Sequence, residues 1–480
     1  RRFLELASRI TRAKPIIAVK SGRSKVGARA ASSHTGALAA SDVAVDALLT
    51  QAGVLRAESI EELFDMAMAF TGRPLPRSRR TAIVTNSGGP GILAADAMET
   101  RGLELVELQP ATIAQLKPLF PEEASIRNPL DMIASATPAD YRTALDAVLR
   151  DPSVDSALAV FVPPLGVRQQ DVAESIVTVA ATHVQKPVLA VLMGSAGLPQ
   201  GRAELHKAGI PAYVFPESAA RGLAALRRQR EWTARPVGSP PVVQVDRARA
   251  ARALAGSGAN GKGKLGELEA LDLLAAYGIP VAASRLAVSP EEAARIAAEL
   301  GFPVVLKAVS PALLHKTDVG GVRVGLTTPV EVATAAAEMV DAVTRALPHA
   351  QLGGLLVQRM VSGGRETIVG MCRDPAFGPL LMFGLGGIYV EALKDVVFRV
   401  APIMPLDAHD MVRSIRGIAL LDGIRGAPPV DFAALTDVLL RVSQLAIDHP
   451  EIVELDVNPL LAFSQGVKAV DARVLVTVTD

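Results

Sequence analysis

Cysteine, aromatic residues and excess charge are all scarce in this sequence of 480 residues. The single cysteine excludes an internal disulfide framework and fits a reducing, cytoplasmic compartment. Aromatic residues make up 4% of the chain, so stacking platforms for nucleic-acid bases are not expected. The 50 basic and 49 acidic residues nearly cancel, which excludes a strong overall attraction to nucleic acid or to an acidic membrane. No apolar run reaches the roughly 20 residues that a membrane-spanning helix needs.

Short apolar runs alternate with alanine-rich helical segments through the first half of the chain. The runs are rich in residues that favour strands, and they span 14–20, 80–86, 156–162, 186–193 and 210–215. This alternation predicts parallel sheets with helices on both faces, which is an α/β fold.

Two stretches rich in proline, glycine and charged or small residues divide the chain, one near 74–80 and a clearer one between 227 and 264. Gly256–Gly263 within the second stretch nearly matches a P-loop, but it ends in glycine where serine or threonine belongs, so it is interpreted as linker. Beyond it, a helix at 267–278 and a strand at 302–309 precede hairpin-like strands at 353–361, 366–372, 379–387 and 396–403. The second half is therefore expected to be α+β with antiparallel pairing.

One histidine stands where an alanine-rich helix is expected to begin, in the stretch RAASSHTGALAAS (29–41). Ser33 and Thr35 are good N-cap residues, and Gly36 lets the backbone approach a ligand. The free N–H groups and the positive dipole end of the helix favour an anion beside His34. A phosphohistidine fits this stretch better than a metal site, since no second ligand lies at metal spacing. The alternative is a surface histidine in a capped turn.

A second expected helix start follows the strand at 80–86. The loop between them is rich in glycine and is formed by Ser87, Gly88, Gly89, Pro90 and Gly91. Backbone N–H groups at such a turn can cradle a phosphate, although a tight turn between strand and helix is an equally good explanation. Two such helix starts in one chain suggest a phosphate held between facing helix dipoles.

A third group of polar residues lies in the second half. Lys307 ends a predicted strand, and the loop 314–322 carries His315 and Lys316. Near the C-terminus, strict alternation places Asp456 and Asn458, together with Glu454, on one strand face, and Asp471 is expected on a neighbouring strand. Carboxylate and amide oxygens suit Mg²⁺ that carries phosphates, whereas the alternative is a solvated strand face.

These motifs together resemble the NDP-forming acyl-CoA synthetases, the ADP-forming acetate–CoA ligase group that is related to succinyl-CoA synthetase. The resemblance implies flavodoxin-like, succinyl-CoA-synthetase-type domains followed by an α+β ATP-grasp domain. The implied domains are a phosphohistidine-bearing domain at 1–75, a second flavodoxin-type domain at 76–230, a linker at 231–263 and the ATP-grasp domain at 264–480.

The resemblance also implies roles for single residues. His34 is the phosphorylated residue and His315 relays phosphate on a swinging loop. Phosphate contacts are expected from Ser33, Thr35, Gly36, Ser87, Gly88, Gly89 and Gly91. Nucleotide contacts are expected from Lys307, Lys316, Gln358, Arg359, Met360 and Glu366. The expected Mg²⁺ ligands are Asp456, Asn458 and Asp471.

The implied activity interconverts acyl-CoA, ADP and phosphate with a carboxylic acid, CoA and ATP, the acid being acetate or another small acid. Family members on one chain normally open with a CoA-binding domain, and none precedes Arg1. A homo- or hetero-oligomer that supplies this domain is therefore expected, as is a cytoplasmic location. Nucleic acid and membrane are not expected as partners.

Two readings of other classes compete with the ligase. Protein lysine acetyltransferases of bacteria carry a similar region as a sensor of nucleotide or CoA ligands, and a nucleotide-binding regulatory subunit is the third possibility. Because such sensor regions commonly lose the active histidine, the presence of His34 and of the metal-type residues favours the enzyme.

Overall fold

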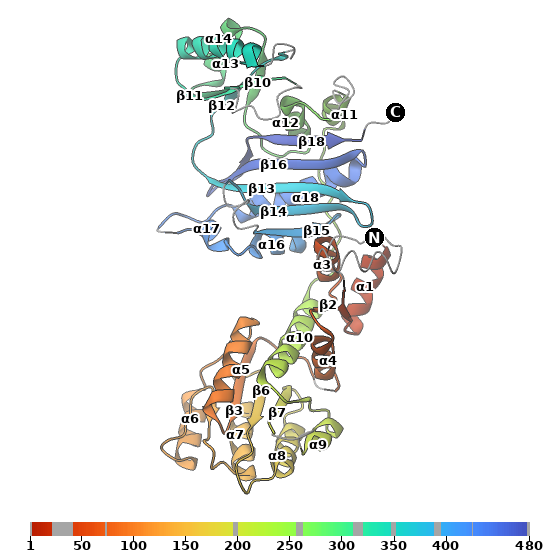
Figure 1. Ribbon diagram of the computed structural model, residues 1–480, viewed down its shortest axis with the longest axis vertical. Helices are drawn as coiled ribbons and strands as arrows, with labels where there is room; N and C mark the ends of the chain where they lie inside the picture. Colours follow the sequence, from red (N-terminus) through yellow and green to blue (C-terminus); the bar gives the residue numbers. More distant parts are fainter. Residues whose placement is uncertain are drawn as a thin grey trace. The chain divides into compact units, whose positions relative to one another are not determined.

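The structure, a computed structural model, describes residues 2–21, 42–72, 74–194, 200–255, 263–310, 320–346, 352–387, 395–424 and 426–477. It divides into two compact units (Figure 1). The first unit comprises Arg1–Ala39 and Leu49–Val237, and the second comprises Ala40–Leu48 and Gly238–Asp480. Each unit is described by itself below.

A small parallel pair of strands opens the first unit. Its elements are α1 (Arg2–Ala13), β1 (Ile17–Val19), β2 (Leu55–Ala57) and α4 (Ile60–Ala69). Helix α3 (Asp42–Gln51) belongs to the second unit up to Leu48 and to the first unit from Leu49. Ile17 lies opposite Leu55 in the parallel ladder. Gly53 has a φ of 68°, and a Cβ atom there would stand 2.0 Å from the ring of Trp232, so only glycine allows this approach.

The larger part of the first unit is a parallel sheet of six strands. The strands are β3 (Arg80–Thr85), β4 (Glu104–Leu105), β5 (Leu130–Asp131), β6 (Ser156–Phe161), β7 (Val188–Leu192) and β8 (Ala212–Tyr213). Their order is β4-β3-β6-β7-β8, and β5 pairs with β3. The expectation of a parallel α/β sheet is confirmed.

Helices cover both faces of this sheet (Figure 1). They are α5 (Gly88–Thr100), α6 (Pro110–Leu116), α7 (Pro138–Arg150), α8 (Gln169–Thr182), α9 (Arg202–Lys207) and α10 (Pro216–Ala234), with a 3-10 turn at Lys117–Leu119. Successive strand residues point to opposite faces. Accordingly, Val84 and Ala159 pack in the core with α7 and α8, while Ile83 and Leu158 pack in the core with α5 and α10.

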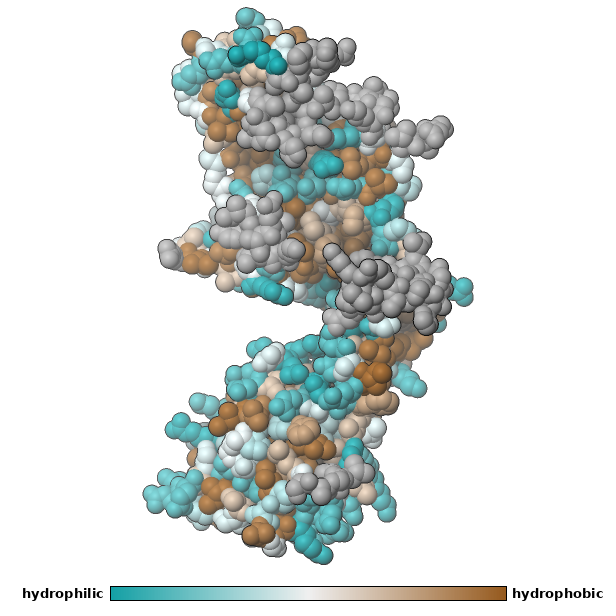
Figure 2. All heavy atoms as spheres, viewed as in Figure 1, coloured by the Kyte–Doolittle hydropathy of each residue, from teal (hydrophilic) through white to brown (hydrophobic). Residues whose placement is uncertain are grey.

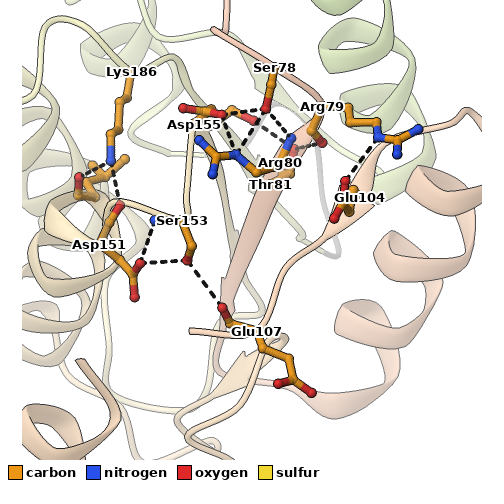
Figure 3. A network of polar contacts seen from close by, with 12 residues as sticks. Ser78, Arg79, Arg80, Thr81, Glu104, Glu107, Asp151, Ser153, Asp155 and Lys186 are labelled. Carbon is orange, nitrogen blue, oxygen red and sulfur yellow. Dashed lines mark hydrogen bonds and ion pairs between the residues drawn. The ribbon is translucent and has the colours of Figure 1, made fainter. Parts of the chain in front are cut away.

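A polar network closes the edge of this sheet at which β3, β6 and β7 begin (Figure 3). We call Ser78, Arg80, Asp151, Asp155 and Lys186 the amino-edge network. Asp155 Oδ2 accepts from Ser78 Oγ at 2.5 Å and from Arg80 Nε at 2.9 Å. Lys186 Nζ donates to the carbonyl oxygens of Leu149 and Asp151, at 2.7 and 2.8 Å. Asp151 is held in turn by the backbone N–H and the hydroxyl of Ser153.

The second unit contains a four-stranded antiparallel sheet of order β11-β10-β12-β9. Its strands are β9 (Ser284–Ala287), β10 (Val304–Val309), β11 (Val322–Leu326) and β12 (Gly354–Arg359), and its helices are α13 (Pro290–Leu300) and α14 (Pro329–Ala346). Leu306 and Val357 pack with these helices. The alternate residues Lys307 and Gln358 therefore lie on the other face of the sheet.

The second unit also contains a sheet with the path β15-β14-β13-β16-β17, to which β18 adds beside β16. Its strands are β13 (Arg365–Asp374), β14 (Gly378–Leu385), β15 (Val396–Val400), β16 (Ile452–Ala462), β17 (Val467–Ala469) and β18 (Ala472–Val476). The accompanying helices are α11 (Arg247–Ala255), α12 (Glu267–Ala276), α16 (Pro405–Arg413), α17 (Ile418–Asp422) and α18 (Phe432–Asp448). All the pairings in this sheet are antiparallel, as expected.

The linker expected over 231–263 is partly helical. Helix α10 continues to Ala234, and α11 occupies Arg247–Ala255. Ala250 and Ala253 of α11 are buried in the large core of the second unit. The arginine- and alanine-rich composition of residues 247–255 favours a helix, as the structure has it. The near-match to a P-loop falls mostly on 256–262, outside the described residues.

Some large hydrophobic residues lie exposed on the surface. Over the domain that contains α5 to α9, the face drawn in Figure 2 shows brown residues as separate groups among teal ones. Such scattered exposure is ordinary for a folded domain. In the part of the chain that the structure describes, no helix combines the length and apolarity needed to cross a membrane.

Candidate functional site

The glycine-rich loop after β3 forms an open helix start. Ser87, the N-cap of α5, has extended backbone angles and its side chain makes no capping hydrogen bond. Gly88 and Gly89 are exposed, and a Cβ atom on Gly89 would meet no other atom within 4 Å. The first N–H groups of a helix have no partner within the helix, so this start can receive an anion. Gly91 is buried, and a Cβ atom there would stand 3.0 Å from Thr85.

Two buried side chains hold this loop to the neighbouring strand. Asn86 donates from Nδ2 to the carbonyl of Val162 at 2.8 Å and accepts the Val162 N–H on Oδ1 at 2.9 Å. The hydroxyl of Tyr141 donates to the same Oδ1 at 3.1 Å and to the carbonyl of Val160 at 2.6 Å. Burial raises the pKa of Tyr141 well above its ordinary value, so the hydroxyl remains a donor. Sequence analysis missed Tyr141, because only the fold brings it to Asn86.

Asp131 also adjoins this helix start. A Cβ atom on Gly88 would stand 3.2 Å from Asp131 Oδ2, and Asp131 Oδ1 accepts the N–H of Ile133 at 3.0 Å. Ile133 has a φ of 60°, which a β-branched residue rarely adopts. Backbone strain of this kind clusters at ligand-binding sites. Neither residue carries a sequence signal that would have predicted it.

A cluster of charged side chains in the second unit includes Lys307 from β10 of the four-stranded sheet and Asp456 from β16 of the other sheet. We call Glu267, Lys307, Asp456 and Asp471 the Lys307 cluster. Lys307 Nζ contacts Glu267 Oε1 at 2.5 Å and Asp471 Oδ2 at 3.8 Å. The side chains of Lys307 and Glu267 are 10% and 5% exposed, whereas that of Asp471 is 46% exposed. The Lys307 ammonium thus forms a short contact with the buried carboxylate of Glu267 and a longer one with the accessible carboxylate of Asp471.

Gln358 joins this group from the adjacent strand β12. Its Nε2 donates to Ser284 Oγ and to the carbonyl of Val470, both at 3.0 Å, and Lys307 Nζ lies 3.5 Å from the same carbonyl. The other amide atom, Oε1, is buried and finds no hydrogen-bond partner in the part of the chain that the structure describes. Gln358 Oε1 could therefore accept a hydrogen bond from a donor group of a bound ligand.

Asp456 is the least satisfied carboxylate of the cluster. Its Oδ1 is buried and has no hydrogen-bond partner among the described residues. Burial raises the pKa of Asp456 above its ordinary value, the neighbouring charges of Glu454 and Asp471 raise it further, and Arg473 opposes them. Two carboxylates close enough to repel one another, one with an unpaired buried oxygen, are the electrostatic mark of a cation site.

The other predicted residues of the second unit that the structure describes make different contacts. Asn458 is exposed, and its backbone N–H donates to the carbonyl of Asp471 at 3.2 Å. The side chain of Arg359 lies beside Gly301 at the end of α13. Glu366 lies against Gly386 and Gly387, four residues along β13 from the residue that pairs with Asp456. The structure thus connects Lys307, Gln358, Asp456 and Asp471, whereas Arg359 and Glu366 lie beside glycines. Met360 follows Arg359 at the end of β12, where its N–H donates to the carbonyl of Pro303.

Six predicted residues lie outside the described part of the chain, so the structure gives no geometry for them. They are Ser33, His34, Thr35, Gly36, His315 and Lys316.

The donor set of the Lys307 cluster fits Mg²⁺. Among the described residues, no group of three His, Cys, Asp or Glu side chains is placed to hold a metal alone. Mg²⁺ commonly takes one or two carboxylates and completes its shell with water and phosphate oxygens. Asp456 and Asp471, with the amide of Asn458 on the same strand face as Asp456, offer this kind of partial set, and the unpaired Asp456 Oδ1 is the observation that supports it.

Three family models match the chain, in the order found along it. They describe a succinyl-CoA ligase like flavodoxin domain at residues 1–70, a ligase-CoA domain at 81–238 and an ATP-grasp domain at 257–476. The fold and these matches define an α/β ligase that combines succinyl-CoA-ligase-like domains with an ATP-grasp domain.

Comparison with curated relatives narrows this class. Acetate–CoA ligase (ADP-forming) I of Archaeoglobus fulgidus is 40% identical over 476 residues, which cover 99% of this chain and 68% of the relative. The 4-hydroxybutyrate–CoA ligase (ADP-forming) of Nitrosopumilus maritimus is 39% identical over 97% of this chain and 66% of the relative. Acetate–CoA ligase (ADP-forming) of Methanocaldococcus jannaschii is 34% identical over 99% of this chain and 69% of the relative.

The chain belongs to the family of ADP-forming acyl-CoA ligases, which are acid–thiol ligases. It spans about two thirds of the length of the relatives it matches. The resemblance seen in the sequence is confirmed, and the comparisons support the ligase rather than the regulatory alternatives.

Solved structures are also similar to this chain. One is the dinucleotide forming acetyl-coenzyme A synthetase 1 of Ca. Korarchaeum cryptofilum in complex with coenzyme A and Mg-AMPPCP. It is 42% identical, covers 48% of this chain and 100% of that chain, and has a TM-score of 0.43.

Proposed function

We propose that this chain performs the phosphoryl-transfer steps of an ADP-forming acyl-CoA ligase, with His34 as the phosphorylated residue and the nucleotide at the Lys307 cluster. The observation that carries this proposal is the buried, unpaired Asp456 Oδ1 beside Asp471, with the Lys307 ammonium 3.8 Å from Asp471. A cation that binds phosphate would satisfy the carboxylates, and the ammonium would meet the phosphate oxygens.

The proposed reaction has three reversible steps. Phosphate attacks the acyl carbonyl of acyl-CoA, which forms an acyl phosphate and releases CoA. The imidazole of His34 then attacks the phosphorus atom of the acyl phosphate, which transfers the phosphoryl group to His34 and releases the free acid. In the last step ADP takes the phosphoryl group from His34, which yields ATP and restores the imidazole. Phosphoryl transfer needs mainly positioning and neutralisation of charge.

Separate groups of residues are assigned to phosphate, nucleotide and metal. The residues assigned to phosphate are Ser33, Thr35, Gly36, Ser87, Gly88, Gly89 and Gly91. The nucleotide is bound by Lys307, Lys316, Gln358, Arg359, Met360 and Glu366, and His315 relays phosphate between the sites. Asp456, Asn458 and Asp471 hold Mg²⁺, which when bound neutralises the charge of the nucleotide phosphates.

We propose acetate or another small acid as the acyl group, because relatives named for acetate are 40% and 34% identical over nearly the whole chain. A relative named trans-feruloyl-CoA synthase is 31% identical over 96% of this chain. An assay should therefore begin with acetate and then test 4-hydroxybutyrate and ferulate.

Related ligases of Pyrococcus furiosus are divided into subunits. The subunit alpha of its acetate–CoA ligase II is 44% identical over 48% of this chain, and the subunit beta of its ligase I is 47% identical over 44% of this chain. We propose that this chain likewise works in a homo- or hetero-oligomer that includes a CoA-binding domain. The domain boundaries and the cytoplasmic location given above remain predictions.

A labelling experiment tests the proposal. The full chain is incubated with Mg²⁺ and γ-labelled ATP beside the variants His34→Ala and His315→Ala, with His409→Ala as the matched control, because His409 is exposed. We expect acid-labile, base-stable label on the wild type and on His409→Ala, and none on His34→Ala. Loss of label in His315→Ala would support the relay. Equal label on His34→Ala and on the wild type would contradict the assignment of His34.

A further inference from the structure

Among the described residues, the one that contacts Lys307 most closely is one to which the family resemblance assigned no role. Glu267 is the first residue of α12, 40 positions before Lys307 in the sequence. Its side chain is 5% exposed, and its Oε1 accepts from Lys307 Nζ at 2.5 Å. A carboxylate buried to this extent persists as a charge only when it is paired.

Lys307 has a second ionic contact, and it competes with the proposed metal. Asp471 Oδ2 lies 3.8 Å from the ammonium, and its side chain is 46% exposed. If the ammonium moved onto Asp471, it would occupy an oxygen that the cation needs. The short contact to Glu267 draws the ammonium away from Asp471.

We propose that Glu267 is a positioning residue: it anchors the Lys307 ammonium so that Asp471 stays available to a divalent cation and the ammonium remains directed at the phosphates. This inference rests on the proposed function, because it takes Asp456 and Asp471 as metal ligands. It adds to that function a buried residue that touches neither metal nor nucleotide.

Glu267→Gln is the direct test, because the amide keeps the shape of the side chain and removes its charge. The ammonium then loses its short ionic contact and shifts toward Asp471. We expect the full chain to bind Mn²⁺ alone, used as the probe for Mg²⁺, about fivefold more weakly, which is the upper end of the scale for one partly exposed ion pair. Titration calorimetry or the electron paramagnetic resonance signal of free Mn²⁺ measures this affinity without any turnover.

A double-mutant cycle separates positioning from a simple loss of negative charge. If Glu267 acts through Lys307, then Glu267→Gln changes Mn²⁺ affinity by less than about twofold when Lys307→Met is already present. Glu269→Gln is the matched control, since Glu269 belongs to the same first helical turn and its carboxylate lies beside Gly266. It should leave Mn²⁺ affinity within about twofold of the wild type.

The outcomes are distinguishable. Unchanged Mn²⁺ affinity in Glu267→Gln overturns the inference and leaves the metal assignment intact. An equal loss with and without Lys307 shows that Glu267 does not act through Lys307, and this also overturns it. Failure of the wild type to bind Mn²⁺ overturns the metal assignment and the inference together. Should Glu267→Gln not fold, Glu267→Asp keeps the charge but withdraws the carboxylate, and it is expected to weaken Mn²⁺ binding by a smaller factor.

Discussion

Each unit of the chain holds a cluster in which a basic side chain meets aspartate at the margin of a sheet. In the amino-edge network, Asp155 receives hydrogen bonds from Ser78 and Arg80, and Lys186 donates to two carbonyl groups. In the Lys307 cluster, Asp456 Oδ1 receives none. Similar residue types thus form a closed network in one place and an open one in the other.

The two aspartates show what this difference means. Burial raises the pKa of each carboxyl. At Asp155 the hydrogen bonds from Arg80 and Ser78 outweigh burial, so its pKa lies below the ordinary value. At Asp456 the neighbouring carboxylates add to burial, so its pKa lies above that value. We therefore interpret the closed amino-edge network as a contribution to stability, and the open Lys307 cluster as a binding site for a ligand.

Of the substitutions considered, removal of the Asp456 carboxylate should have the largest effect, and it should lower activity rather than stability. In Asp456→Asn the amide cannot replace a charged metal ligand, so the rate of Mg²⁺-dependent labelling at His34 is expected to fall on the order of 100-fold. The midpoint of thermal unfolding in metal-free buffer should stay the same or rise, because repulsion from Glu454 and Asp471 is relieved. A clear drop in that midpoint with activity retained would show that Asp456 is a structural residue.

An aspartate-to-asparagine substitution in the amino-edge network should have the opposite result, a loss of stability with activity retained. Asp155→Asn removes the charge that holds Arg80 and Ser78, so the free energy of unfolding is expected to fall by about 1–3 kcal/mol. Denaturant titration measures this, and labelling at His34 under native conditions should be unchanged. Unaltered stability would mean that water replaces Asp155 without cost.

A smaller difference is expected in the dependence of stability on pH. The folded pKa of Asp155 lies below its unfolded value, so the folded state binds fewer protons. Its stabilising contribution is present above the unfolded pKa of about 3.9 and is lost as the pH falls through the lower, folded pKa. Arg80 keeps its charge throughout this range.

Because other carboxylates titrate in the same range, the measurement is the difference between the unfolding free energies of wild type and Asp155→Asn from pH 7 to pH 2.5. This difference should be constant near neutrality and shrink only below about pH 4. A difference that stays constant down to the lowest pH would contradict the pairing of Asp155 in the folded state.

Local pattern predicted much of the fold and part of the site. The strict alternation around Asp456 was sufficient to place it on a polar strand face, and the apolar run before Lys307 was sufficient to place that residue on a strand. Glu267 lies 40 positions from Lys307, and Tyr141 lies 55 from Asn86, so no local pattern connects either pair. Contacts of this kind depend on which face a helix turns toward a sheet, and periodicity does not specify that choice. Helix α11, by contrast, has a local signal, because arginine, alanine and leucine are strong helix formers.

The carbonyl group of Val470 has a mechanical consequence. It accepts from Gln358 at 3.0 Å and lies 3.5 Å from Lys307 Nζ, so one peptide group joins β10 and β12 to the segment that leads into β18. Rotation of one sheet of the second unit against the other would change the lengths of these contacts. The carbonyl of Val470, next to Asp471, therefore couples the position of the Lys307 ammonium to the relative orientation of the two sheets.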